Sequence, residues 1–337
     1  MDTYKMYGVL RKTPVDDEKN DAWGFPNAPD LRPHDAKVLF VGDSFGIGSS
    51  VGSRQSPAAF FARLTHVPVY NASHGAYGLA QYLAIIRQAV QQLPPAQRFA
   101  GRDIVLLTFL GNDYTADIAQ YDRNSLYVDH SLAWIARIGP LRSWIDYLRM
   151  VYAMPATGKT QPVGRYAPIP VTCDTAEHLP FALHPGFSLF TSSTRVLRYF
   201  AGARPFVEQL AAIKAQGFRI RVVVIPVALQ VIYKDIDWGA MDPKSPCATS
   251  LPTIYATAND LRDHVVALYR HYGFETLDLT DILANAPQHC RYFQPADTHC
   301  TALGYEAIAR AIANRWPDLG KETASAPDAP ARQPTTR

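Results

Sequence analysis

The feature that most constrains the fold of this chain is a set of short apolar runs that alternate with longer segments of helical periodicity. Residues 37–41 (KVLFV), 103–110 (DIVLLTFL) and 219–225 (RIRVVVI) are short and rich in β-branched residues, so they are predicted to be buried strands. Strands that alternate with helices predict an α/β fold with a central parallel sheet. The remaining elements are expected as strands at 67–70 and 275–279 and helices at 56–65, 79–92, 192–216, 253–272 and 301–316.

The alternation covers residues 37–317, which we expect to form one domain. Residues 1–36 are polar, rich in Pro and Asp, and are expected to be an extended lead-in. The segment at about 114–190 interrupts the alternation with many Tyr and Pro residues, and is interpreted as an inserted, lid-like region. Residues 318–337 contain few apolar side chains and are predicted to be a disordered tail.

The composition excludes several classes of protein. Of the 337 residues 47% are hydrophobic and 19% are charged, which is typical of a folded globular protein, and the formal net charge is only +3. A dedicated nucleic-acid binder would carry a clustered basic face, so no nucleic-acid partner is expected. No run of 18 apolar residues occurs, and no membrane span is expected. The N-terminus lacks a signal pattern, so a periplasmic or extracytoplasmic location is expected only if a signal or anchor has been removed. The sequence favours no oligomeric state.

Four polar loops are expected at one edge of the sheet. Ligands of open α/β sheets bind at the carboxyl ends of the strands. Residues 42–46 follow the first strand, 71–78 the second and 111–113 the third, while 297–299 precede the last helix. Together these loops contain a serine, backbone donors, an asparagine amide and an Asp/His pair, which is a set that suits acyl transfer.

Within these loops the chemistry assigns a role to each residue type. Ser44 is the candidate nucleophile, because a hydroxyl becomes a good nucleophile when an adjacent base takes its proton. His299 is the candidate base, and Asp297 would orient it. An oxyanion could be held by the backbone N–H of Ser44, a backbone N–H near Gly75 and the amide of Asn112. Less specific candidates for substrate contact complete the set: Asp43, His74, Tyr77, Asp113 and Tyr114. Of these, Asp43, His74 and Asp113 also suit purely local turn and hydrogen-bonding roles, and the rings of Tyr77 and Tyr114 could simply pack.

These four loops resemble the sequence blocks of the SGNH (GDSL-like) serine hydrolases. VLFVGDSFGIG is similar to the first block, NASHGAYG to the second, GND to the third and ADTHCTALGYEAIARAI to the last, in the family's order. The resemblance implies a flavodoxin-like α/β/α fold and a Ser-His-Asp triad. The family's second-block donor would fall near Ala76, so Gly75, Ala76 and Gly78 stay open as donors.

The last block departs from the commoner family pattern. It has the spacing D-x-H instead of D-x-x-H, which resembles the SGNH proteins that handle acyl groups on exported polysaccharides, including the alginate O-acetyltransferases. Those proteins often carry Trp after the histidine, where this chain has Cys300. The resemblance implies a substrate that is an acylated carbohydrate or another small ester.

The preferred hypothesis is therefore hydrolysis of an ester-linked acyl group, with acetyl and a glycan favoured, through an acyl-enzyme on Ser44 and without a cofactor. An O-acyltransferase that passes the group to a polysaccharide hydroxyl is the nearest alternative. A non-catalytic carbohydrate-binding protein on the same fold is a further one.

The cysteines and the possible metal ligands are less informative. No pair among Cys173, Cys247, Cys290 and Cys300 has a C-x-x-C spacing, and no clustered ligands are apparent, so no metal site is expected. Cys290 and Cys300 flank Asp297, and a disulfide between them would brace that loop in an oxidising compartment. Four buried thiols fit the same sequence.

Overall fold

The computed structural model describes most of the chain. The described residues are 3–6, 9–12, 20–21, 23–75, 77–114, 168–172, 178–182, 190–241, 246–294 and 299–321.

The centre of the molecule is a five-stranded parallel sheet with the strand order β4-β3-β5-β8-β9. In chain order this is 2-1-3-4-5, the order of the flavodoxin-like doubly wound fold. Its strands are β3 (Val38–Val41), β4 (Val69–Asn71), β5 (Asp103–Phe109), β8 (Arg219–Ile225) and β9 (Glu275–Asp278). The strands β3 and β5 are buried along their whole length, as expected for parallel strands that helices cover on both faces.

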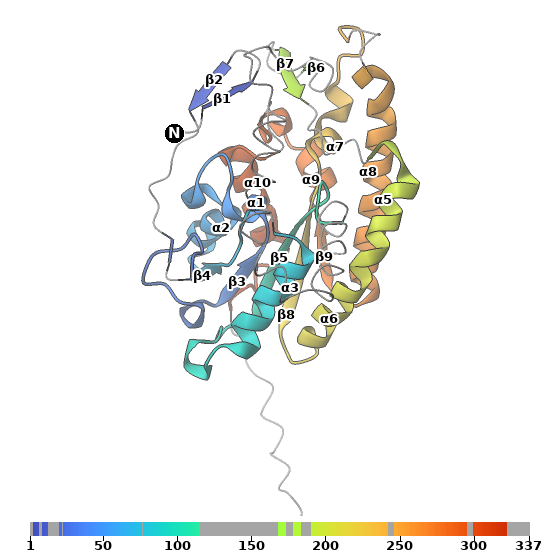
Figure 1. Ribbon diagram of the computed structural model, residues 1–337. Helices are drawn as coiled ribbons and strands as arrows, with labels where there is room; N and C mark the ends of the chain where they lie inside the picture. Colours follow the sequence, from blue (N-terminus) through green and yellow to red (C-terminus); the bar gives the residue numbers. More distant parts are fainter. Residues whose placement is uncertain are drawn as a thin grey trace, which may run out of the picture.

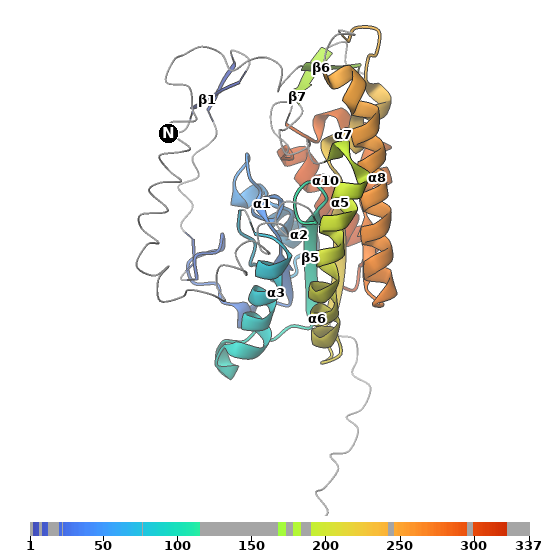
Figure 2. The same ribbon diagram turned by 45° about the vertical axis from the view of Figure 1, so that its right-hand side comes forward.

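Helices form the two outer layers (Figures 1 and 2). On one face α2 (Pro57–Thr65) packs against α10 (Ala302–Arg315). The other face carries α3 (Leu79–Arg87), α5 (Ser193–Phe200), α6 (Arg204–Lys214) and α8 (Pro246–His271). The predicted α/β/α architecture with a central parallel sheet is confirmed.

Local capping chemistry explains where several of these helices begin. Ser56 accepts a hydrogen bond from the backbone N–H of Ala59 at the start of α2, and Pro57 occupies the first helical position. Thr301 accepts one from Gly304 N at the start of α10. These caps fix where α2 and α10 begin, and the two helices pack against each other, with α2 also in contact with α1 after β3.

Three helices differ from the boundaries that were expected. The helix predicted over 192–216 is divided into α5, a short 3-10 turn at Ala201–Ala203 and α6, and Pro205 lies in the first turn of α6. Proline lacks a backbone N–H and suits a helix start better than an interior. By contrast, α8 begins before the predicted residue 253 and contains Pro252 within it. The expected 79–92 helix ends as a π-helical turn at Gln88–Gln92.

Two segments outside the central sheet form antiparallel hairpins. The lead-in contains an antiparallel hairpin of β1 (Thr3–Met6) and β2 (Val9–Lys12). In the inserted region β6 (Pro168–Thr172) and β7 (His178–Ala182) form a second hairpin, while 115–167, 173–177 and 183–189 lie outside the described residues.

The prediction of a disordered tail over 318–337 is wrong for the first residues of that segment. Leu319 is buried, and Gly320 N donates a hydrogen bond to Asp103 Oδ2. These contacts hold the chain up to Lys321 against the edge of the sheet at which the strands begin. The remainder of the predicted tail, 322–337, lies outside the described residues.

A charge network joins the amino ends of β5 and β8. Arg221 Nη1 lies 2.8 Å from Asp103 Oδ1, and its Nη2 lies 2.6 Å from Asp318 Oδ2. Arg219 Nη2 contacts the second oxygen of Asp103 at 2.5 Å. The hydrogen bond and charge of Arg221 outweigh partial desolvation, so the pKa of Asp318 is lowered. The network lies at the edge of the sheet opposite the loops that carry the candidate site.

No helix within the described ranges is long and apolar enough to cross a membrane.

Candidate active site

The fold brings Ser44 and His299 together from opposite ends of the domain. Ser44 is the first residue of α1 (Ser44–Ile47), directly after β3, and His299 lies just before α10. Ser44 Oγ and His299 Nε2 are 2.8 Å apart, which is hydrogen-bond distance. A hydroxyl in contact with an imidazole nitrogen is the arrangement that deprotonates a serine nucleophile.

The turn that carries Ser44 is held by the residues on either side of it. Asp43 Oδ1 accepts a hydrogen bond of 2.9 Å from Phe45 N and so caps α1. A Cβ atom added to Gly46 would lie 2.2 Å from Ser73 Oγ, so only glycine fits where the loop after β4 crosses α1. Asn71 Nδ2 also donates to Gly46 O. The apolar strand therefore ends in a turn whose composition is dictated by close packing.

Asp43 is a structural residue of this turn. Its side chain is 1% exposed, so the predicted contact with substrate is wrong and the alternative role in fixing the turn is the one observed. Burial raises the pKa of the Asp43 carboxyl to about 6, although the Phe45 N–H and the charge of His299 act in the opposite direction. Asp43 thus places a titratable group beside the Ser44–His299 pair.

His299 is held by packing and by its backbone. Its ring lies against Phe45, with centroids 5.2 Å apart, and Phe45 in turn packs on Phe109. The backbone carbonyl of His299 accepts a hydrogen bond of 2.9 Å from Gln294 N. Asp297, the predicted third member of the triad, lies outside the described residues. The aromatic contact with Phe45 was not expected from the sequence, although Phe45 directly follows the nucleophile.

The candidate oxyanion donors follow the expected strands. Asn112 is half-buried in the turn at the carboxyl end of β5, and Gly75 is half-buried in the loop after β4. The N–H of Gly78 donates to Gln81 Oε1 at 3.2 Å, where it helps to cap α3. Gly78 is therefore the weakest of the predicted backbone donors, and Ala76 lies outside the described residues.

For Asp113 and Tyr114 the fold buries the side chain, so the predicted contact with substrate is wrong, and the alternative local hydrogen-bonding and packing roles are the ones observed. Asp113 is 0% exposed and accepts hydrogen bonds from the Tyr82 hydroxyl and from Phe109 N. Tyr114 is also 0% exposed, and its hydroxyl contacts that of Tyr269 at 3.2 Å. Both side chains point into the protein because the turn after β5 folds back toward α3 and α8.

His74 and Tyr77 remain near the surface. Their rings are stacked with centroids 4.6 Å apart, and His74 Nδ1 lies 2.8 Å from Gly75 O. The local hydrogen-bonding role expected for His74 is observed, and Tyr77 is half-buried beside it.

The predicted Cys290–Cys300 disulfide is wrong. Cys290 is in a disulfide, whereas Cys300 is a buried thiol. The segment that contains Phe293 pairs with Cys300 as an isolated antiparallel bridge, so backbone hydrogen bonds brace this loop instead. The side chains of the two other cysteines, Cys173 and Cys247, lie outside the described part of the chain.

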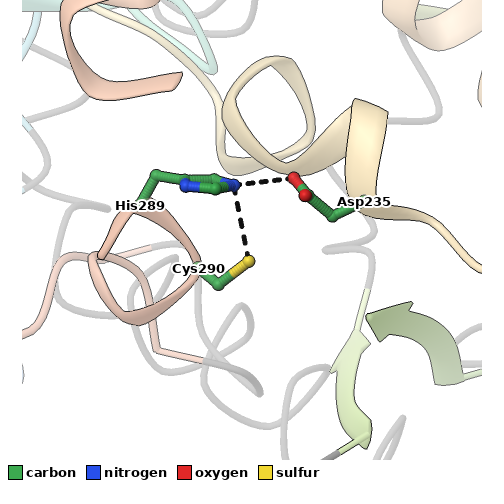
Figure 3. Close-up of side chains that lie close together, drawn as sticks. All are labelled: Asp235, His289 and Cys290. Carbon is green, nitrogen blue, oxygen red and sulfur yellow. Dashed lines mark hydrogen bonds and ion pairs between the residues drawn. The ribbon is translucent and has the colours of Figure 1, made fainter. Parts of the chain in front are cut away.

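One cluster in the described residues has the composition of a metal site, contrary to the expectation that none would gather. Asp235, His289 and Cys290 place an oxygen, a nitrogen and a sulfur within 4.8 Å of one another (Figure 3). A cysteine must be a thiolate to bind a metal ion, and the sulfur of Cys290 is committed to a disulfide. The cluster was missed because Asp235 is far from His289 in the sequence.

Comparison with known proteins gives distant structural likenesses only. A scan against family models and a search of curated proteins found no match. Among solved structures, the chain is similar to a member of the lipolytic protein G-D-S-L family from Veillonella parvula (TM-score 0.42, 12% identity, 84% of this chain and 98% of that chain). It is also similar to phospholipase A1 from Streptomyces albidoflavus (TM-score 0.41, 12% identity, 83% and 98%). A third is a family two carbohydrate esterase from Clostridium thermocellum in complex with cellohexaose (TM-score 0.36, 11% identity, 85% and 66%). Likenesses this distant carry no functional argument, so function is argued from the contacts of Ser44 and His299.

Proposed function

We propose that this protein is a serine hydrolase that cleaves ester-linked acyl groups through an acyl-enzyme on Ser44. The observation that carries the proposal is the 2.8 Å separation of Ser44 Oγ and His299 Nε2 at the carboxyl edge of the sheet. A serine can occupy a turn for structural reasons alone, but such a serine has no need of an imidazole nitrogen on its hydroxyl.

The proposed reaction has two halves. Ser44 Oγ attacks the acyl carbon while His299 Nε2 takes its proton, and His299 then gives that proton to the departing alcohol. Water, deprotonated by His299, attacks the acyl-enzyme, and His299 returns that proton to Ser44 Oγ as the bond to the acyl group breaks and the acid leaves. Asp297 is assigned the orientation of the imidazole, as the resemblance implies.

The negative charge on the acyl oxygen requires donors. The backbone N–H of Ser44, the Gly75 region and the amide of Asn112 are assigned to this role, because they follow three neighbouring strands of the same sheet edge. Loss of one such donor typically lowers the rate by about 10²–10³-fold.

The proposed substrate is an O-acetylated glycan. The support is the D-x-H spacing around His299, which resembles proteins that act on acylated polysaccharides. In the O-acyltransferase alternative, a sugar hydroxyl replaces water in the second half of the reaction. Adding an oligosaccharide acceptor to the assay below separates these outcomes, because transfer yields an acetylated oligosaccharide and hydrolysis yields acetate.

The test is ester hydrolysis by wild type, Ser44→Ala and His299→Ala, with aryl esters of graded acyl chain length. Both variants are expected to lose at least about 10⁴-fold in kcat, since members of such a pair act as a unit. Ser53→Ala, which removes a serine hydroxyl from the 3-10 turn at Ser53–Gln55, is the matched control and should keep full activity. Mass spectrometry after treatment with a serine-directed phosphonate should find the label on Ser44.

Activity of Ser44→Ala within tenfold of wild type would contradict the proposal. A folded wild-type protein that neither hydrolyses the esters nor takes up the phosphonate would favour the non-catalytic carbohydrate-binding alternative.

A further inference from the structure

We propose that Asp235 and His289 are positioning residues that hold His299 within reach of Ser44. This inference rests on the proposed function, because it concerns the same imidazole. The two residues touch neither Ser44 nor His299, and they act through the backbone segment that carries His299.

The side chains of Asp235 and His289 are in direct contact. His289 Nε2 lies 2.7 Å from Asp235 Oδ2 (Figure 3). Its Nδ1 lies 2.9 Å from the carbonyl oxygen of Ala286. Both ring nitrogens therefore have an oxygen partner, which leaves the imidazole one orientation. The side chains are only 18% and 23% exposed, so solvent screens this pair less than a surface ion pair.

The backbone that follows His289 is hydrogen-bonded to the backbone at His299. His289 is the first residue of the 3-10 turn η9 (His289–Arg291), and the residues after this turn pair with the segment that starts at His299. Gln294 N donates to His299 O at 2.9 Å, and Thr301 N donates to Tyr292 O at 2.8 Å. Residues 292–294, which directly follow the His289 turn, thus form a platform to which the backbone of His299 is hydrogen-bonded.

A further contact makes this platform stiff. The Thr301 hydroxyl donates to the carbonyl oxygen of Arg291 at 2.7 Å, and a Cβ atom added to Gly304 would lie 2.2 Å from Tyr292 O. The start of α10 is consequently packed directly on the segment that follows η9. A shift of η9 cannot be absorbed there and would be passed to His299.

Asp235, the other member of the pair, is held by the segments on either side of it. Asp235 ends the 3-10 turn η8 (Tyr233–Asp235), which follows α7 (Ala228–Ile232) at the carboxyl end of β8. The residues after it pair with β6 of the inserted region: Ile236 forms a bridge with Val171, and Asp237 N donates to Pro170 O at 2.9 Å. Asp235 is therefore held between the sheet and the β6–β7 hairpin.

These contacts run from the inserted hairpin and β8, through the Asp235–His289 pair and residues 292–294, to the backbone of His299. A displacement of a reacting group by about 1 Å can lower the rate about 10²-fold. The Asp235–His289 pair can therefore affect catalysis strongly although it lies outside the site. The residues 295–298, which directly precede His299, lie outside the described part of the chain, and the platform at 292–294 is the described support on that side.

The experiment compares Asp235→Ala, His289→Ala and Asp235→Asn with wild type. Asparagine keeps the shape and can donate its amide N–H to His289 Nε2 while Nδ1–H keeps Ala286 O. We expect kcat to fall about 10-fold to 100-fold in both alanine variants with KM nearly unchanged, and most of the activity to return in Asp235→Asn. The rate of phosphonate labelling at Ser44 should fall in parallel with kcat.

The control is Arg219→Ala, which removes an ion pair with Asp103 at the opposite edge of the sheet. It is expected to lower the midpoint of thermal unfolding without changing kcat at temperatures well below that midpoint. If the alanine variants at 235 and 289 also unfold at a lower temperature but keep wild-type kcat and labelling, the Asp235–His289 contact stabilises the fold without positioning His299, and the inference is overturned.

The inference and the proposed function fail in different ways. Wild-type activity that depends on Ser44, together with unchanged kcat in the variants at 235 and 289, overturns the inference alone. Wild-type activity that persists in Ser44→Ala overturns the proposed function and the inference with it.

Discussion

The buried carboxyl group of Asp43 makes the stability of this protein depend on pH in a defined direction. Burial raises the pKa of Asp43 from 3.8 to about 6, so the folded chain binds a proton more tightly than the unfolded chain. The free energy of unfolding is then expected to fall as the pH rises from about 4 to about 6, and to stay at the lower value above that range. A difference of about two pKa units corresponds to about 3 kcal/mol.

The perturbation that isolates this effect is Asp43→Asn. Asparagine can still accept the hydrogen bond from Phe45 N, but it has no charge to desolvate. Its buried amide adds a cost that does not vary with pH. The difference in unfolding free energy between the variant and wild type should therefore shift in favour of the variant by up to about 3 kcal/mol between pH about 4 and pH about 7.

The assay is urea-induced unfolding followed by circular dichroism at several pH values in one buffer series. Subtracting the wild-type curve from that of the variant cancels the contribution of the other carboxylates. A difference that is constant across this pH range would refute the reasoning, because it would mean that Asp43 titrates alike in the folded and unfolded chains.

Three further predictions follow from packing and charge. Gly46→Ala should cost about 1–3 kcal/mol of stability because its Cβ would meet Ser73 Oγ at 2.2 Å. Ser73→Gly should restore most of that loss in the double variant, and strictly additive losses in a denaturation cycle would argue against the clash. Arg221→Leu should lower stability by about 3–5 kcal/mol, measured by chemical denaturation, because Asp103 would stay buried with one partner fewer. Its ester hydrolysis should be unchanged well below the unfolding midpoint, and a loss of stability under about 1 kcal/mol would contradict this reasoning. Asp318, whose pKa is lowered from 3.8, stabilises the fold fully above that unfolded-state value and loses this contribution as the pH falls through its folded pKa. Asp318→Asn should therefore be less stable than wild type at neutral pH but not in strong acid, and equal stability at both pH values would count against the ion pair.

Much of the sheet could be predicted because its signals are local. The run at 219–225 coincides with β8, and 103–110 and 37–41 each differ from β5 and β3 by a single residue at one end. A buried parallel strand needs apolar side chains on both faces, so its composition alone reveals it. Helix boundaries were predicted less well where Pro205 and Pro252 lie, because a proline can begin a helix or sit within one.

The site was predictable to the same extent. Placing Ser44 and His299 at one sheet edge required only the rule that loops at the carboxyl ends of parallel strands converge. The burial of Asp113 and Tyr114 was not predictable, because the turn after β5 could direct them outward or inward and only their partners Tyr82 and Tyr269 decide the direction.

The sequence by itself determined the order of strands and helices, the turn glycines and the residue types available at the carboxyl edge, since each depends on neighbours along the chain. Beyond the meeting of Ser44 and His299, the tertiary structure decided which distant groups are in contact. The Asp235–His289 contact joins two segments that are far apart in the sequence, and nothing in the sequence indicates that they pair. The involvement of Cys290, and not Cys300, in a disulfide was likewise decided by the fold, because a disulfide forms only where two sulfur atoms are brought within bonding distance.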